Sequence, residues 1–198
     1  MRSPVDLIGL VFFFVMVALW TIFGLIFGLR KKPPKTAEQA RDTRSLDGLL
    51  LQSIGYALAW TIPRPEFSPI VPMPKWAEIA VAAAGIVLAA ISLSLMWRAI
   101  IVLGRQWGYV ARIIEGHRLI TEGPYSLVRN PIYTGMFGIL IATGLAASRW
   151  PMLIAAILFF LCGTWVRIHR EENLLRQSFG PEFEVYRSRV PAFLPWLF

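Results

Sequence analysis

The residues best placed to do chemistry lie near the end of the last long apolar run, in the sequence WVRIHREENLL. Arg167 and Glu171 are four residues apart, so in a helix their side chains lie on the same face. A guanidinium offers a planar set of donors that suits a carboxylate, and a carboxylate suits an ammonium group. Because charge is costly close to a membrane, this placement favours a binding site. An ordinary ion pair along a helix explains the spacing equally well.

The second candidate segment is the polar connector Gly104–Pro131, which mixes aromatic, basic and turn-forming residues. A connector of this length inside a compact domain is usually functional or disordered, and its spaced apolar residues argue against disorder. It contains His117, whose simplest role is that of a loop histidine bound to a backbone carbonyl. Tyr125 and Tyr133 are also explained as aromatic residues at a membrane interface.

The elements that must position these residues are membrane-spanning helices. Hydrophobic residues make up 56% of the 198 and charged residues only 16%, whereas soluble domains carry about a quarter charged residues. A helix that crosses the hydrocarbon needs about 20 apolar residues. Cys162, the one cysteine, lies in an apolar run, so we expect a buried thiol, no disulfide and no thiolate metal site. The predicted spans are Leu7–Leu29, Gly48–Pro63, Ile79–Trp97, Pro131–Ser148 and Trp150–Val166.

The distribution of lysine and arginine predicts how these spans are oriented. Sixteen of the 20 basic residues fall on one side of the predicted membrane and four on the other. Since cytoplasmic loops carry the basic excess, a multi-pass cell-membrane protein is expected with its N-terminus outside and its C-terminus in the cytoplasm. Basic residues follow the first apolar run, so we expect that run to be retained rather than cleaved as a signal peptide. The predicted cytoplasmic segments are Lys31–Ser45, Gly104–Asn130 and Arg167–Phe198.

The expected fold is therefore an all-α integral membrane protein with five transmembrane helices in a single domain. Residues 1–97 contain structural spans, which lack the ionisable residue in mid-membrane that marks a transport path. Residues 98–198 hold the chemistry, and the fifth span continues as a helix to Gly180. The net charge of +8 is explained by contact with anionic membrane lipids, so no nucleic-acid partner is expected.

Three blocks, in order, carry a family resemblance: EGHRLITEGPYSLVRNPIYTG, RIHREENLL and FGPEFEVYRSRVPAFLP. Together they cover Leu103–Pro195 and resemble the isoprenylcysteine carboxyl methyltransferase family, in its short prokaryotic form. Any single block is also shared with membrane reductases and phospholipid methyltransferases. The resemblance implies S-adenosylmethionine-dependent methyl transfer to a lipid-like or prenylated acceptor at the cytoplasmic face. It also implies a cofactor pocket built from the connector before the fourth helix and from the C-terminal tail.

The resemblance assigns roles to individual residues. Glu171 would bind the ammonium of the cofactor's methionine moiety, and Arg167 would face the carboxylate of the acceptor. The glycine-rich fingerprint of soluble nucleotide-binding folds is absent from the sequence. The cofactor wall would instead be formed, largely through backbone groups, by His117, Arg118, Leu119, Ile120, Tyr125, Asn130, Pro131, Ile132 and Tyr133.

Asn130 departs from the family pattern, which usually has histidine at this position. Asparagine donates and accepts hydrogen bonds but does not titrate, so a structural or cofactor-binding role remains and a general-base role does not. The family's glutamine upstream of the His117 block has no clear counterpart here. Glu172 and Arg176 are also four residues apart, and we expect an ordinary solvated ion pair from them. His169 is assigned no role.

Several functions remain open. A carboxylate acceptor is ionised at neutral pH and needs no general base, which favours carboxyl O-methylation of an isoprenylcysteine-like or other apolar acid. Methylation of a phospholipid amine is the nearest alternative. A sterol-type reductase with a nicotinamide cofactor is disfavoured, because such proteins tend to have an Arg-Asp pair where this chain has Glu171 and Glu172. A small scaffold or transport protein is the non-enzymatic alternative, and the uncharged spans argue against transport.

Overall fold

The computed structural model describes residues 6–28, 38–61 and 67–195. Much of the predicted linker Lys31–Ser45 therefore lies outside the described residues, as do positions 62–66 and 196–198. The elements, in chain order, are α1 (Leu7–Gly28), β1 (Glu38–Asp42), α2 (Ser45–Thr61), α3 (Lys75–Leu103), η2 (Gly104–Gln106), β2 (Ala111–Ile114), η3 (Gly123–Ser126), α4 (Pro131–Ala147), α5 (Trp150–Phe179) and α6 (Pro181–Arg189).

Within the described residues, three helices are long and apolar enough to cross a membrane, namely α1, α3 with the turn that follows it, and α5. The shorter α4 is also apolar and has 17 residues. Every predicted span coincides with a helix, but α2 has only 17 residues, carries Asp47 in its first turn and buries Gln52. The count of five spans therefore stays a prediction.

The helix of the third predicted span is longer than the span itself, because the apolar sequence AIIVL extends α3 past Arg98 to Leu103. One expectation about these helices is wrong. Cys162 is exposed on α5 rather than buried. Its neighbours Leu158 and Trp165 are also exposed, at 59% and 62%. This is expected where a helix presents an apolar face to lipid rather than to protein.

The contacts between residues divide the chain into two compact units. The boundaries after residues 52, 94, 134 and 160 fall inside helices rather than at residue 98, and the proposed functional division at that residue stays a prediction. Unit 1 consists of residues 1–30, 53–94 and 135–160, and unit 2 consists of residues 31–52, 95–134 and 161–198.

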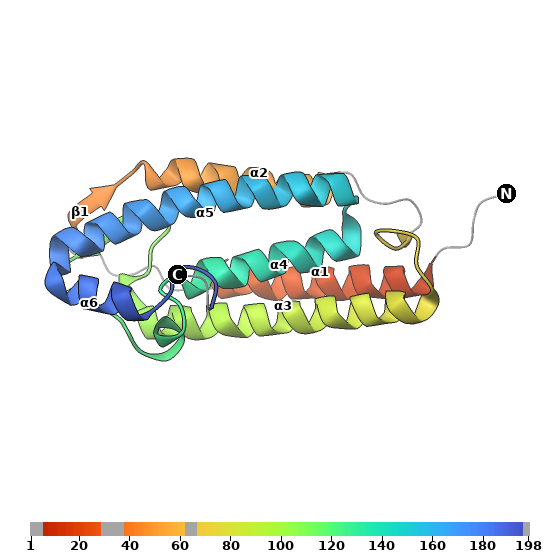
Figure 1. Ribbon diagram of the computed structural model, residues 1–198, viewed down its shortest axis with the longest axis horizontal. Coiled ribbons are helices and arrows are strands. Elements are labelled where there is room, and N and C mark those ends of the chain that lie inside the picture. Colours follow the sequence, from red (N-terminus) through yellow and green to blue (C-terminus); the bar gives the residue numbers. More distant parts are fainter. Residues whose placement is uncertain (1–5, 29–37, 62–66, 196–198) are drawn as a thin grey trace. The chain divides into compact units, whose positions relative to one another are not determined.

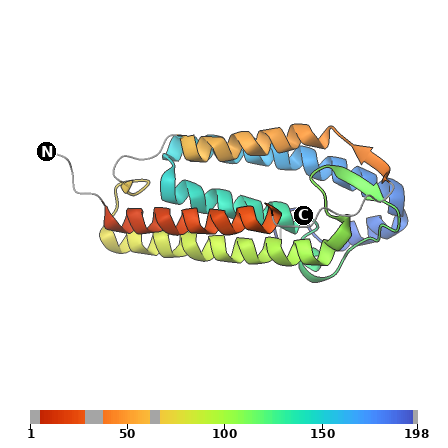
Figure 2. The same cartoon turned by 180° about the vertical axis from the view of Figure 1, so that it is seen from behind.

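Unit 1 is built from apolar helices that approach closely at small residues. In both views of the ribbon, α1 and α3 lie side by side (Figures 1 and 2), and a Cβ at Gly85 would lie 2.4 Å from the ring of Phe12. The indole of Trp20 in α1 donates to the hydroxyl of Thr143 in α4 at 2.8 Å. Inside an apolar bundle such pairing removes the cost of a buried polar group without a partner.

Unit 2 contains a two-stranded antiparallel sheet that the all-α prediction missed. The strand β1 pairs with β2 in the connector, so that Asp42 lies opposite Ala111. Ser45, the first residue of α2, donates to the carbonyl of Asp42 at 2.8 Å and accepts from the amide of Ala111 at 3.1 Å. The sheet therefore ties the start of α2 to the connector. Strands of four and five residues are too short to give a clear periodic pattern in the sequence.

The C-terminal part of unit 2 forms as the sequence predicts up to Gly180. The helix α5 runs to Phe179, and Gly180 ends it with a φ of 50°, a left-handed conformation that favours glycine. Pro181 then starts α6, where its missing amide hydrogen costs nothing. In Figure 1 the short α6 follows the turn at the end of α5. Its buried residues Phe183 and Tyr186 form a small core with neighbouring apolar side chains of α5.

Candidate active site

The RNPIY block and the RIHREENLL block meet in unit 2 at Tyr133, Arg167 and Glu171. Arg167 donates from Nε to the hydroxyl of Tyr133 at 2.8 Å and from Nη2 to the backbone carbonyl of Tyr109 at 2.9 Å. The hydroxyl of Tyr133 also contacts the carboxylate of Glu171, which lies 3.5 Å from Nη2 of Arg167. The two charged residues that share one face of α5 are thus joined by a phenol from the first turn of α4.

Burial differs sharply between the two charged side chains. That of Arg167 is 5% exposed, whereas that of Glu171 is 28% exposed. Nη1 of Arg167 is buried and has no hydrogen-bond partner among the described residues. A buried N–H group without an acceptor is costly, so this nitrogen is the open position of the cluster. The other two guanidinium nitrogens, Nε and Nη2, are held by the protein.

Two glycines allow α2 to approach α5 beside Arg167. A Cβ on Gly48 would lie 2.6 Å from Cγ of Arg167 and 2.6 Å from the carbonyl oxygen of Gly163. A Cβ on Gly163 would lie 2.5 Å from the carbonyl oxygen of Gly48. One turn further along α2, the amide of Gln52 donates to the hydroxyl of Thr164 at 2.9 Å. This hydrogen bond satisfies the side-chain nitrogen of a glutamine that is buried within an apolar helix.

The His117 block makes its contacts with other parts of unit 2. The ring of His117 lies 6.0 Å from that of Phe179, and its buried Nδ1 has no partner among the described residues. Burial, and then the nearby charge of Arg112, lowers the pKa of His117, so the imidazole is neutral at neutral pH. The side chain of Gln106 accepts from the amide of Arg118 at 2.6 Å and donates to its carbonyl at 3.1 Å. That amide is therefore already bound within the protein.

The next part of the predicted cofactor wall rests on α6. Leu119 packs against the core of Phe183 and Tyr186. The hydroxyl of Tyr186 donates to the backbone carbonyl of Tyr125 at 2.6 Å. Burial raises the pKa of Tyr186, which keeps this hydroxyl protonated as the hydrogen-bond donor. The remaining wall residues are half-buried or buried, namely Ile120, Ile132 and Pro131.

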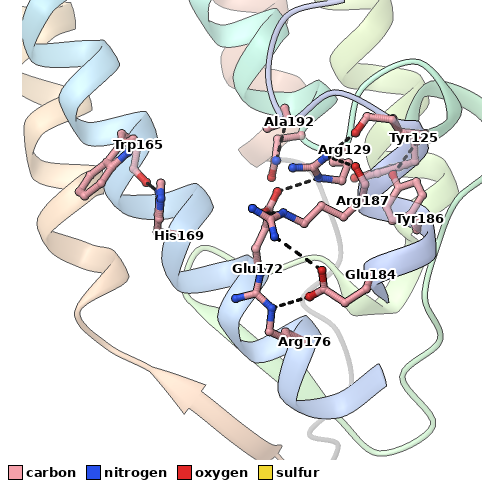
Figure 3. Close-up of polar contacts among 12 residues, drawn as sticks. Tyr125, Arg129, Trp165, His169, Glu172, Arg176, Glu184, Tyr186, Arg187 and Ala192 are labelled. Atoms are coloured by element: carbon pink, nitrogen blue, oxygen red, sulfur yellow. Dashed lines mark hydrogen bonds and ion pairs between the residues drawn. The ribbon is translucent and has the colours of Figure 1, made fainter. Parts of the chain in front are cut away.

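The expected ion pair between Glu172 and Arg176 is wrong. Figure 3 shows buried Glu172 between Arg129, at 2.9 Å, and Arg187, at 3.8 Å. Arg176 instead pairs with Glu184 of α6 at 2.6 Å (Figure 3). The tertiary fold brings oppositely charged groups from α6 and the connector against α5, and these replace the partner one helical turn away.

Asn130 has a partner in the tail. Its side-chain nitrogen donates to the backbone carbonyl of Ala192 at 2.8 Å, which agrees with the structural role that the sequence left open. The unassigned His169 lies against Trp165, with the ring centroids 4.2 Å apart (Figure 3). Its Nδ1 is 2.8 Å from the backbone carbonyl of the same tryptophan.

Sequence reasoning missed several residues that hold the site in place. Tyr109 acts through its backbone carbonyl, so its residue type carries no signal. Gln106 binds the backbone of Arg118 across twelve positions of connector. The position of Arg129 directly before Asn130 in the recognised block was the one available hint of its role.

Fold and site together define a membrane protein whose apolar helices carry a cluster of Tyr133 from α4 with Arg167 and Glu171 from α5. The family model described as phospholipid methyltransferase matches residues 80–182. The chain belongs to this family of membrane methyltransferases.

Curated relatives confirm the resemblance to isoprenylcysteine methyltransferases. The chain is 33% identical over 115 residues to a probable protein-S-isoprenylcysteine O-methyltransferase of Oryza sativa subsp. indica, covering 57% of this chain and 60% of the relative. It is 34% identical over 105 residues to protein-S-isoprenylcysteine O-methyltransferase B of Arabidopsis thaliana, covering 50% and 51%. It is also 41% identical over 101 residues to the nickel-cobalt-cadmium resistance protein NccN of Alcaligenes xylosoxydans xylosoxydans, covering 48% and 45%. The match thus spans 60% or less of each of these relatives.

Proposed function

We propose that this chain transfers a methyl group from S-adenosylmethionine to the carboxylate of an isoprenylcysteine-like or other apolar acid, at the cytoplasmic face of the cell membrane. The observation that carries the proposal is the cluster of Tyr133, Arg167 and Glu171. In it, a partly exposed carboxylate and a buried arginine nitrogen that has no partner among the described residues lie on one helix face. Membership of a methyltransferase family favours methyl transfer over reduction by a nicotinamide cofactor.

The polar and apolar groups that unit 2 offers to a ligand fit S-adenosylmethionine. Glu171 would bind the ammonium group, with its carboxylate oriented by the hydroxyl of Tyr133. His117 offers a buried ring nitrogen without a partner among the described residues, and Ile120 and Ile132 offer half-buried apolar surface. When bound, the cofactor supplies a methyl group on a positively charged sulfur. The task of the protein is then to align the acceptor and exclude water.

Arg167 would hold the carboxylate of the acceptor through Nη1. The carbonyl of Tyr109 and the hydroxyl of Tyr133 fix the plane of the guanidinium, so its open nitrogen is oriented before the acceptor arrives. A carboxylic acid is ionised at neutral pH, so no side chain has to remove a proton. This agrees with a cluster that contains an arginine, a phenol and a carboxylate but no histidine.

Calorimetry with S-adenosylhomocysteine tests the cofactor assignment. Glu171→Gln should weaken binding by about 1.5–3 kcal/mol, the usual worth of a hydrogen bond to a charged group. The matched control is Glu182→Gln, because Glu182 is exposed on α6. Glu172 is unsuitable as a control, since it holds Arg129 and Arg187. Equal weakening by the two substitutions would exclude Glu171 as a ligand of the cofactor. If the wild type binds NADPH but not S-adenosylhomocysteine, methyl transfer would be excluded.

Single-turnover methyl transfer from labelled cofactor tests the acceptor. The substrates are farnesylcysteine-like acids and lipid amines, compared across pH. Acids should be methylated with a flat profile from neutral pH upward. Arg167→Lys should lower turnover on acids by roughly a hundredfold, or about 3 kcal/mol, with a smaller effect on cofactor affinity. The matched control is Arg170→Lys, because Arg170 is the partly exposed partner of Asp42 at 3.7 Å.

A phospholipid amine is the second candidate acceptor, and the description of the matched family favours it. An amine must lose a proton before it attacks, so activity would rise toward the pKa of that amine. The cation of Arg167 would then repel the protonated substrate, and its removal would not reduce turnover. Wild-type activity confined to amines would refute the carboxylate proposal. Unchanged turnover of Arg167→Lys on acids would show that this arginine has no role in the reaction.

A further inference from the structure

The four residues after α6 form a strap, Val190–Phe193, that lies along the RNPIY block. Every backbone carbonyl of the strap accepts a hydrogen bond from that block or from the residue after it. The donors reach successive carbonyls of the strap, so the strap is held along its own whole length. The pairs are Val190 with Nη1 of Arg129, Pro191 with the amide of Arg129 at 2.8 Å, Ala192 with Nδ2 of Asn130 at 2.8 Å, and Phe193 with the hydroxyl of Thr134.

We propose that Asn130 is a positioning residue that latches this strap and thereby holds the cofactor wall in place. The inference rests on the proposed function, because it concerns the wall that would bind S-adenosylmethionine. What the site requires from position 130 is an N–H group aimed at the carbonyl of Ala192. Asparagine supplies that group, and so does either ring nitrogen of a histidine that carries hydrogen. The position therefore contributes a donor, and acid–base chemistry plays no part in its role.

The latch acts on the first turn of α4. Asn130 directly precedes Pro131, the first residue of that helix, and its carbonyl accepts from the amide of Thr134 at 3.2 Å. In the same turn, Tyr133 reaches across to Arg167 and Glu171. A loose strap would leave this turn less well fixed, so affinity for the cofactor should fall more than turnover at saturating cofactor.

The substitution Asn130→Asp removes the hydrogen bond to the strap without weakening the start of α4. Aspartate is as good as asparagine at the residue before a helix, and a negative charge is favourable there. The ionised carboxylate has no hydrogen to donate, so it would face the carbonyl of Ala192 without a bond. Asn130→His keeps a donor in both its neutral and its charged form.

The experiment measures hydrogen exchange of peptides that cover the strap, together with S-adenosylhomocysteine affinity, at pH 7.5. Each variant is compared with wild type at the same pH. The matched control is Asn173→Asp, because Asn173 is the second asparagine of the chain and is exposed on α5. Asn130→Asp should exchange faster and bind on the order of tenfold more weakly, as for one lost hydrogen bond. Asn130→His should match wild type in both properties, because it keeps the donor.

Two results would overturn the latch. One is an Asn130→Asp variant whose strap exchanges like wild type, and the other is an Asn130→His variant whose strap exchanges as fast as that of Asn130→Asp. Failure of wild type to bind S-adenosylhomocysteine would refute the proposed function instead. The exchange data would still decide whether Asn130 holds the strap. If the wild type binds S-adenosylhomocysteine normally and the strap of Asn130→Asp is unaltered, the proposed function stands and the proposed latch is refuted.

Discussion

The close approach of α2 to α5 beside Arg167 makes a specific prediction for Gly48→Ala. The added Cβ would meet Cγ of Arg167 and the carbonyl oxygen of Gly163, both at 2.6 Å, so the helices must separate or the arginine must move. A backbone oxygen cannot be displaced as a flexible side chain can. Because Arg167 is held by Tyr133 and Tyr109, any shift of its stem also disturbs the open Nη1.

The magnitude follows from two opposing terms. Forcing a methyl group into a well-packed contact usually costs about 1–3 kcal/mol. Replacing glycine by alanine within a helix gains about 0.5–1 kcal/mol. Gly48→Ala should therefore lose roughly 0.5–2 kcal/mol of unfolding free energy. Gly24→Ala in α1 should gain up to about 1 kcal/mol, because its Cβ would meet nothing within 4 Å.

Thermal unfolding in detergent and single-turnover methyl transfer together test this prediction. Gly48→Ala should unfold at a lower temperature than wild type, and its turnover should fall further than its cofactor affinity. Gly24→Ala should match or exceed wild type in both assays. If Gly48→Ala is as stable and as active as Gly24→Ala, then α2 does not pack against Arg167 as described.

Three further predictions concern charge and topology. Glu172→Gln should destabilise the protein by about 3–5 kcal/mol, as when one partner of a buried ion pair is removed, and thermal unfolding beside the exposed control Glu182→Gln measures this. The pKa of His117 is lowered in the fold, so its contribution to stability should be complete above about pH 6.5 and decline as the pH falls, because the unfolded chain binds the proton more readily. His117→Gln should lack this part of the pH dependence of thermal unfolding, and an identical dependence would contradict it. In a Cys162→Ala background, a cysteine at Glu115 should be labelled only from the cytoplasmic side of sealed vesicles and one at Val71 only from outside; the reverse would invert the proposed topology.

Local sequence patterns predicted much of the secondary structure. Long apolar runs gave a helix at each predicted span, and the pair Gly180 and Pro181 correctly marked the end of α5. The spacing of Arg167 and Glu171 correctly placed both on one face. Each of these features depends on neighbours within a few positions, where the periodicity of the helix and the geometry of glycine and proline apply directly.

The partners of the charged and polar groups were decided by the tertiary structure alone. The sequence paired Glu172 with Arg176 four positions away, but the fold offers Arg129, which is 43 positions away in the chain. Asn130 finds Ala192 across 62 positions, and the short strands β1 and β2 form only because each meets the other. A buried charge or N–H group is satisfied by whichever partner the packed chain brings within reach. Sequence spacing can therefore determine which residues share a helix face, whereas only the folded chain determines what that face contacts.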